Sequence, residues 1–270
     1  MANSKPIEII VCGAAGRMGT AILQLAFENP QFIVAGAVES KVSSAVGGDA
    51  GEIAGVSRRN IKIGSDLSAV LQKGRVIITF TSPDATSDHL KTATSLGAPI
   101  VIGTTGLTEQ HLLAIKTASK RIPVLHSSNM SVGVNIFWKL VRRAAELAKG
   151  YDVEIAEFHH NQKKDSPSGT AKTTLEIVAD VRHLEPKRDF KYGRVGESAK
   201  RSPGEIGIHA LRGGGVIGDH TIYFAGPNDR LEITHRAQGR ESFAHGALLG
   251  AAFLANKKAG LYTMDDVLGL

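Results

Sequence analysis

The feature that most limits the possible folds of this chain is a glycine-rich turn, GAAGRMG (13–19), between two apolar runs. The run before it, IEIIVCG (7–13), is continuous and rich in β-branched residues, which is typical of a buried strand of a parallel sheet. The residues after the turn carry apolar side chains at helical spacing, and FIVAGAVES (32–40) has the character of a second buried strand. The pattern predicts a βαβ unit with the glycines at its first turn.

Gly13, Gly16 and Gly19 form a G-x-x-G-x-x-G variant of the dinucleotide-binding fingerprint. The first glycine permits a sharp turn, the second lets backbone N–H groups approach a pyrophosphate, and the third lets helix and strand pack closely. Glu39 lies at the end of the second strand, where its carboxylate can accept hydrogen bonds from the adenosine ribose. We therefore expect NADH, NADPH or both as cofactor.

Glu39 also bears on the choice between these two cofactors. Its negative charge opposes the 2′-phosphate of NADPH, whereas Lys41, two residues further on, could reach that phosphate. We expect a preference for NADH with some tolerance of NADPH.

The strand–loop–helix pattern then continues three times, over residues 75–97, 99–121 and 122–148. Each predicted strand ends in a polar turn, and these turns are TSPD (81–84), GTTG (103–106) and SSNMS (127–131). In open α/β sheets, ligands bind outside the carboxyl ends of the strands. The repeats predict a Rossmann-like, doubly wound parallel sheet whose edge faces the nicotinamide half of the cofactor.

After Gly150 the pattern changes to that of a second, α+β domain. YDVEIAEFHH (151–160) alternates like a strand with one solvated face, and residues 171–184 have helical spacing. Residues 205–237 indicate several antiparallel strands, with turns at GGG and GPND, so the second sheet is expected to be mixed.

The apolar helix and tail at the end of the chain are expected to pack back on the first domain. The predicted domains are therefore 1–130 with 241–270, which would bind the dinucleotide, and 131–240.

The segment HHNQKKDSPSGTAK (159–172) concentrates polar residues before the predicted helix of the second domain. Free N–H groups at the start of that helix, around Ser168 to Thr170, can hold a carboxylate. Lys163 or Lys164 can supply a cation or a proton, and histidine suits proton transfer near neutral pH. His159 and His160 would point to opposite sides if the strand continues through them, so they are expected to have different tasks.

Composition and charge argue against several classes of protein. The net charge of +6 comes from scattered basic residues and only 5% of residues are aromatic, so no nucleic-acid partner is expected. No apolar run approaches the roughly 18–20 residues that span a bilayer, and the N-terminus lacks a signal-peptide layout. With one cysteine, Cys12, and no His-x-x-x-His pair, we expect a cytoplasmic protein without a membrane partner or a metal site.

The segment EFHHNQKKDSPSGTA (157–171) resembles the most specific motif of the 4-hydroxy-tetrahydrodipicolinate reductases, also called dihydrodipicolinate reductases. Other blocks of that family occur in the same order over essentially the whole chain: GAAGRMG, GTTG, SSNMSVGVN and LRGGGVIGDHTIYF. The resemblance implies NAD(P)H-dependent reduction of a cyclic dicarboxylate in diaminopimelate and lysine biosynthesis. It also implies a homotetramer that is built through the substrate-binding second domain.

The resemblance assigns tasks to particular residues. His159 would be the proton donor or acceptor and Lys163 the catalytic acid, although the division of proton transfer between them stays open. Substrate would be bound by His160, Gly169 and Thr170. From the helix start we also expect Ser168 to bind it, and Arg240, at the return to the first domain, to approach it. Cofactor contacts would come from Gly13, Ala14, Ala15, Gly16, Arg17, Met18, Glu39, Gly103, Thr104, Thr105, Ser127, Ser128, Asn129 and Met130. Family members often place an arginine after the ribose-binding acid, where it aids NADPH binding, and this chain has Ser40 there.

Two alternative functions fit parts of the pattern. One is another two-domain NAD(P)-dependent dehydrogenase of amino-acid metabolism, but a phosphorylating semialdehyde dehydrogenase needs a nucleophilic cysteine, and Cys12 instead ends the first predicted strand. The other is a nicotinamide-sensing repressor, which would require a DNA-reading motif that is not evident and would leave the histidine–lysine segment without a task.

Overall fold

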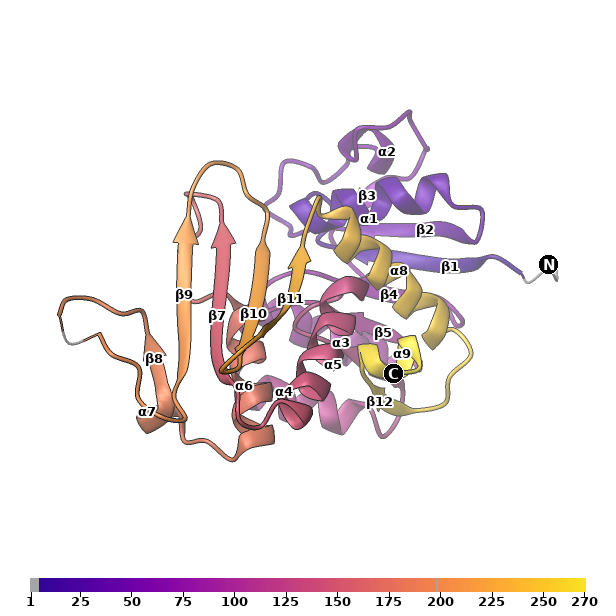
Figure 1. The fold of residues 1–270 in the computed structure, drawn as a ribbon. Coiled ribbons are helices and arrows are strands. Elements are labelled where there is room, and N and C mark those ends of the chain that lie inside the picture. Colours follow the sequence, from indigo (N-terminus) through magenta and orange to yellow (C-terminus); the bar gives the residue numbers. More distant parts are fainter. Residues whose placement is uncertain (1–4, 198) are drawn as a thin grey trace. The chain divides into compact units, whose positions relative to one another are not determined.

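The computed structural model describes residues 5–197 and 199–270, and the chain divides into two compact units (Figure 1). The first unit consists of Met1–Val132 and Arg240–Leu270, and the second of Gly133–Gly239. Among the described residues, none of the helices combines the length and the hydropathy that crossing a lipid bilayer requires.

The first unit is built on a parallel sheet with the strand order β12-β6-β5-β4-β1-β2-β3. The order reverses between β1 and β4, which is the position where doubly wound sheets bind their ligands. The strands are β1 (Ile7–Cys12), β2 (Phe32–Val38), β3 (Ile63–Gly64), β4 (Val76–Thr79), β5 (Ile100–Ile102), β6 (Pro123–His126) and β12 (Gly260–Tyr262).

Helices cover both faces of this sheet, so its central strands are buried and mostly apolar. Side chains of α1 (Arg17–Glu28) and α8 (Glu241–Leu254) share one hydrophobic cluster with the sheet. Those of α3 (Pro83–Leu96) and α4 (Glu109–Ala118) share a second cluster on the opposite face. Two short helices, α2 (Ala50–Ile53) and α9 (Met264–Leu268), complete the unit.

The start of α3 illustrates why these helices begin where they do. The Ser82 hydroxyl accepts a hydrogen bond from the Ala85 amide, and Pro83 occupies the first turn, where a missing N–H costs nothing. The helix ends at Gly97, whose φ of 66° is left-handed.

The prediction of a Rossmann-like, doubly wound parallel sheet is confirmed, as is a second domain with a mixed sheet. The C-terminal apolar helix, α8, belongs to the first unit and packs against α1. The two-residue strand β3 and the three-residue strand β12 were not predicted, because such short strands leave no periodic pattern.

The second unit holds a mixed sheet with the strand order β11-β10-β7-β9-β8. Its strands are β7 (Asp152–His159), β8 (Phe190–Tyr192), β9 (Ile206–Arg212), β10 (Asp219–Ala225) and β11 (Arg230–Arg236). The helices α5 (Val132–Leu147) and α6 (Gly169–Arg182) pack on one face of this sheet, and α7 (Pro186–Asp189) is short.

The prediction that residues 205–237 form several antiparallel strands is wrong for β9. This strand pairs in parallel with β7 and β8, and only β10 and β11 form an antiparallel hairpin, closed by the Gly226 amide donating to the Asp229 carbonyl. β7 lies between β9 and β10, so the GGG segment connects two strands that do not pair. Residue patterns identify strands, but tertiary packing decides which strands pair.

Candidate active site

The turn after β1 is held in a conformation that requires glycine. Gly13 has a φ of 79°, and a Cβ atom there would lie 2.5 Å from the Phe80 carbonyl oxygen. A Cβ at Gly19 would lie 2.0 Å from the Gly13 carbonyl oxygen, so α1 approaches the end of β1 more closely than any other residue allows. These contacts are those that the fingerprint predicts for its first and third glycines.

The residues around this turn fit a dinucleotide. Within residues 5–197 and 199–270, no side chain caps α1 at Gly16, so the N–H groups of its first turn remain for an anionic ligand. Glu39 lies beside them, accepting hydrogen bonds from the Ala15 amide at 3.0 Å and the Ser40 amide at 2.8 Å. These two hydrogen bonds anchor Glu39 at the place where the fingerprint puts the ribose-binding acid.

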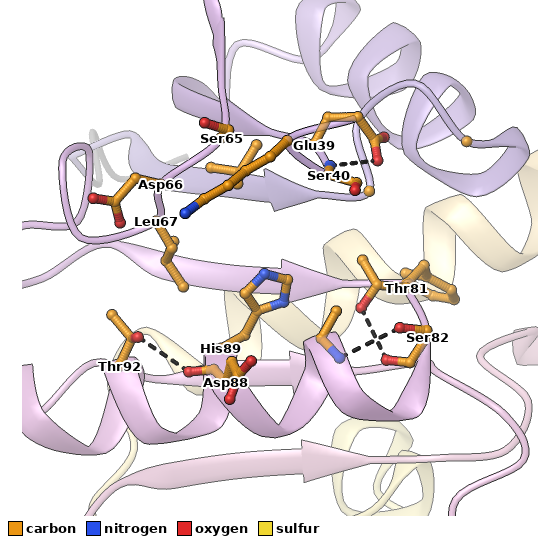
Figure 2. Close-up of a pocket in the computed structure, with 16 residues that line it drawn as sticks. Glu39, Ser40, Ser65, Asp66, Leu67, Thr81, Ser82, Asp88, His89 and Thr92 are labelled. Atoms are coloured by element: carbon orange, nitrogen blue, oxygen red, sulfur yellow. Dashed lines mark hydrogen bonds between the residues drawn. The ribbon is translucent and has the colours of Figure 1, made fainter. Parts of the chain in front are cut away.

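A pocket of about 580 Å³ opens beside this turn. Figure 2 shows Glu39, Ser40 and Asp66 on one side of it and Thr81, His89 and Thr92 on the other. Burial lowers the pKa of His89, so that imidazole is neutral near pH 7. The pocket is lined by Gly13, Gly16, Val38, Glu39, Ser40, Lys41, Ser65, Asp66, Leu67, Phe80, Thr81, Ser82, Ala85, Asp88, His89 and Thr92.

The other predicted cofactor residues lie around the same edge of the sheet but do not line this pocket. Ala14 is buried after β1, Arg17 is exposed at the start of α1, and Met18 is half-buried. Thr104 is buried, and its hydroxyl is engaged by Thr86 and by the Thr81 amide. The remaining residues follow β5 and β6, where Gly103 and Met130 are buried, Ser127 and Asn129 half-buried, and Thr105 and Ser128 exposed. Their contact with a cofactor stays a prediction.

The second unit brings together several residues of the HHNQKKDSPSGTAK segment. His159 is the last residue of β7 and is buried, whereas His160 follows the strand and is only half-buried, so the two histidines have different environments. Ser168 is the N-cap of α6, with its hydroxyl accepting from the Ala171 amide at 3.2 Å. Gly169 and Thr170 form the first turn of that 14-residue helix.

Glu157 is the centre of this arrangement. Its side chain is fully buried, and its carboxylate is hydrogen-bonded to His159 Nδ1 at 2.5 Å and accepts the Ser168 amide at 3.1 Å. Arg212 donates to both carboxylate oxygens, at 2.8 and 2.9 Å. Burial acts to raise the pKa of Glu157, but the hydrogen bonds from His159, Arg212 and Ser168 outweigh it and lower the pKa to about 2. Glu157 is therefore ionised at neutral pH.

Lys163 lies four residues after His159 and is also largely buried. Its ammonium group donates to both oxygens of Asp165, at 2.8 and 3.0 Å, and its backbone amide donates to the His160 carbonyl. Lys164 is exposed. Arg240 belongs to the first unit, where it is exposed and precedes α8, so its predicted contact with the substrate also stays a prediction.

Several residues of the two sites were not identified from the sequence. Glu157 could have been, because the alternation of β7 places it on the same face as Val153 and Ile155, and a charged residue at a buried position needs partners. Arg212 and His220 come from β9 and β10, which no local pattern connects to β7. The pocket residues His89 and Asp66 likewise follow no motif.

Comparison with known proteins gives a consistent result along the chain. The family model described as dihydrodipicolinate reductase, N-terminus, matches residues 7–130, and that described as dihydrodipicolinate reductase, C-terminus, matches residues 133–268. The 4-hydroxy-tetrahydrodipicolinate reductase of Anaeromyxobacter dehalogenans strain 2CP-1 is 46% identical over 97% of this chain and 98% of its own length. The 4-hydroxy-tetrahydrodipicolinate reductase of Caldanaerobacter subterraneus subsp. tengcongensis is 42% identical over 97% of this chain and 98% of its own length.

A solved structure has the same fold. The dipicolinate-bound dihydrodipicolinate reductase from Paenisporosarcina sp. TG-14 superimposes with a TM-score of 0.73 over 96% of this chain and 98% of that chain, at 22% identity.

The charges of the pocket lead to a prediction about cofactor selectivity. Glu39, Asp66 and Asp88 place three carboxylates around it, and the nearby cation Lys41 already contributes to lowering the pKa of Asp66, after hydrogen bonds from Ser68. We expect NADH to bind roughly tenfold more tightly than NADPH, because these carboxylates repel a 2′-phosphate. Dissociation constants measured by nicotinamide fluorescence check this.

A matched pair of variants tests the cause. Ser40→Arg should tighten NADPH binding by about tenfold with little effect on NADH, whereas Ser44→Arg, exposed and outside the pocket lining, should change neither. Tighter binding of NADPH than of NADH by the unmodified protein would contradict the prediction.

Proposed function

Because the chain belongs to the dihydrodipicolinate reductase family, we infer that it reduces 4-hydroxy-tetrahydrodipicolinate, by way of dihydrodipicolinate, to tetrahydrodipicolinate. This is the reduction step of diaminopimelate and lysine biosynthesis, and its cofactor is NADH or NADPH. The observation that carries the inference is that both family models match in order and together span nearly the whole chain. The carboxylate-binding turn and the histidine–lysine segment then supply the chemistry that this substrate needs.

The first task of the second unit is to hold a rigid ring with two carboxylates. We propose that one carboxylate binds the backbone N–H groups of Gly169 and Thr170 at the start of α6, where the helix dipole favours an anion. The Ser168 amide, which we expected at the same carboxylate, donates to Glu157 instead, so Ser168 would contribute by capping this turn. His160, half-buried directly after β7, would receive the second carboxylate. Two anchored carboxylates fix which face of the ring is presented for reaction.

The second task is to supply a proton. When bound, NAD(P)H delivers a hydride to C4 of the substrate ring, which is conjugated with the imine. The electron pair then moves to the ring nitrogen, and an acid beside the substrate must protonate the product. We propose His159 and Lys163 for this step, since both are largely buried in the same segment and each has a carboxylate partner.

We also propose that Arg240 contacts the substrate. It is exposed at the start of α8, and its guanidinium group could pair with a substrate carboxylate.

Steady-state assays of NADH oxidation on freshly prepared substrate test both the function and the placing of Lys163. The unmodified protein should turn over, and Lys163→Ala should lower kcat by about 100-fold or more, because an acid of the reaction is removed. The dissociation constant for NADH should stay within about twofold.

Lys164→Ala is the matched control, because Lys164 is exposed and next in sequence. It should leave kcat and the KM for the substrate nearly unchanged. If NADH binding fell as far as turnover in Lys163→Ala, the assignment of Lys163 would be wrong.

We further propose that the protein is a homotetramer that assembles through the sheet of its second unit. On the face opposite α5 and α6, Phe158, Leu211 and Tyr223 are at least partly exposed and belong to none of the hydrophobic clusters of the described residues. A partly apolar sheet face of this kind favours association between copies.

Analytical ultracentrifugation should give four times the mass of one chain. Tyr223→Glu should produce smaller species, because it places a charge in the proposed interface. Tyr192→Glu is the matched control, since Tyr192 pairs in register with the buried Ile208 and thus lies on the other face of the sheet. A monomeric unmodified protein would contradict the proposal.

We propose a cytoplasmic location, because a reductive biosynthetic step draws on the cytoplasmic NAD(P)H pool. Fractionation of cells that express the chain should recover the NADH-oxidising activity with cytoplasmic markers, and recovery with the membrane or secreted fractions would contradict this.

A further inference from the structure

Glu157 is a buried charge that the proposed reaction does not yet use. Its side chain is fully buried on the covered face of β7. Glu154, on the opposite face of the same strand, is partly exposed to solvent. Burying a carboxylate costs free energy unless its partners compensate for the lost hydration. The number and identity of its partners are therefore informative about what it does.

Among the described residues, the groups hydrogen-bonded to this carboxylate are an arginine, a backbone amide and an imidazole nitrogen. Arg212 pairs with it through two hydrogen bonds, and the parallel register of β7 and β9 places Arg212 opposite His159. The Ser168 amide donates to one oxygen, and His159 Nδ1 is 2.5 Å from the other. One carboxylate thus joins the end of β7, the end of β9 and the start of α6.

We propose that Glu157, held by Arg212, is the positioning residue that fixes the tautomer and orientation of His159 and ties it to the carboxylate-binding turn at Ser168. The proposal rests on the proposed function, since it concerns how that site handles its proton. Glu157 touches neither reacting atoms nor cofactor in this role, and it acts through His159.

The tautomer follows from what each group can do. An ionised carboxylate only accepts hydrogen bonds, so His159 must carry its hydrogen on Nδ1. Nε2 is then the nitrogen that exchanges a proton with the substrate. The negative charge of Glu157 lies on the Nδ1–H side of the ring, which is where a buried carboxylate orients histidine in other acid–base sites.

The other charged and titratable groups around His159 do not replace Glu157. His220, on β10, meets the His159 ring edge-on at 5.1 Å, and burial lowers its pKa to about 3, so it stays neutral and bonds to the Ser168 hydroxyl. His235, on β11, is also made less basic by burial. Lys163 and Asp165, in the loop after β7, pair with each other. Glu157 is therefore the anion that faces the imidazole directly.

Glu157→Gln separates the contact with Ser168 from the contact with His159. A glutamine oxygen can still accept the Ser168 amide, so the affinity for dipicolinate, used as a non-reacting dicarboxylate, should change by less than about threefold. The amide nitrogen would present a donor to His159 Nδ1 and so favour the wrong tautomer. We expect kcat to fall about tenfold or more while the dissociation constant for NADH stays unchanged.

The pH profile distinguishes positioning from a structural effect. In Glu157→Gln, Arg212 remains beside His159 without its counter-charge, so the imidazolium form is disfavoured. The alkaline limb of the kcat/KM profile should therefore move to lower pH by about one unit or more. A loss of packing would lower the rate without moving this limb.

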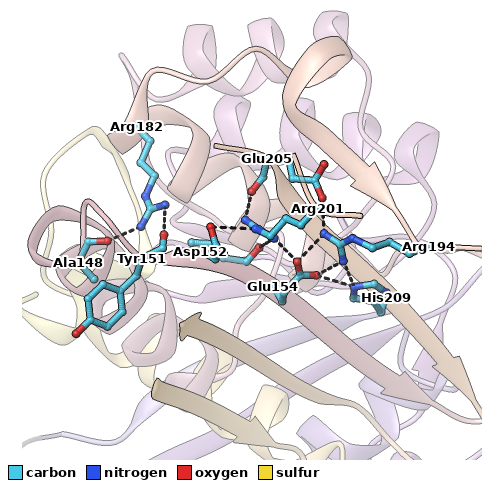
Figure 3. Close-up of polar contacts among 10 residues, drawn as sticks. Ala148, Tyr151, Asp152, Glu154, Arg182, Arg194, Arg201, Glu205 and His209 are labelled. Carbon is cyan, nitrogen blue, oxygen red and sulfur yellow. Dashed lines mark hydrogen bonds and ion pairs between the residues drawn. The ribbon is translucent and has the colours of Figure 1, made fainter. Parts of the chain in front are cut away.

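Glu154→Gln is the matched control, because Glu154 is a second arginine-paired glutamate on the same strand. Figure 3 shows Glu154 among Arg194, Arg201 and His209. Glu205 forms a second ion pair with Arg194. Its contacts resemble those of Glu157, but it does not contact His159. This variant should lower the thermal stability to a similar extent or more and leave the pH profile in place.

A measurement on the unmodified protein covers the case in which Glu157→Gln does not fold. Histidine ¹⁵N NMR, with His159 assigned from a His159→Gln variant, should give the Nδ1–H tautomer for the neutral ring. An Nε2–H tautomer would overturn the proposal, as would a Glu157→Gln enzyme with unchanged kcat and pH profile. Absence of turnover by the unmodified protein would refute the proposed function instead, and the NMR result would still decide the placing of Glu157.

Discussion

Parallel pairing of buried strands is the constraint on which both sites depend. Faces of strands that helices cover carry mostly apolar side chains, so most polar groups of the two sites come from the segments where the strands end. In the first unit, β1 and β4 end side by side at Cys12 and Thr79, and the next residues, Gly13 and Phe80, lie so close that the turn requires glycine. In the second unit, the parallel strands β7 and β9 end together at His159 and Arg212.

Much of the first unit could be predicted because its signals are local. A β-branched run, three glycines at fixed spacing and an acid after the next strand are features of one continuous segment, and the structure places Gly13, Gly16 and Glu39 at one pocket. The far wall of that pocket, with His89 and Asp66, comes from separate loops. Their sequence neighbourhoods resemble any capped helix or turn, so only the folded arrangement identifies them.

The second unit was harder to predict because its geometry depends on pairing between distant strands. Alternation located β7, but it did not reveal that β9 runs parallel beside it, and the antiparallel arrangement that we expected would not have placed Arg212 opposite His159. The same alternation did contain a usable signal for Glu157, which shares a face with Val153 and Ile155. A charge at an apolar position of a strand indicates either solvent at that position or a partner from elsewhere.

The two sites share one structural feature, a helix start beside the end of a strand, and this has a chemical consequence. The glycine turn of α1 and the serine-capped turn of α6 both offer backbone N–H groups at a helix start. Anions held by backbone amides need no ionisable side chain, so under the proposed function His159 and Lys163 would be left to exchange protons. Glu157 connects these two tasks, because the carboxylate that orients His159 also holds the Ser168 amide. A shift of the turn at Ser168 would therefore change the position of the imidazole, so the proposed substrate binding and proton transfer would be coupled through one buried residue.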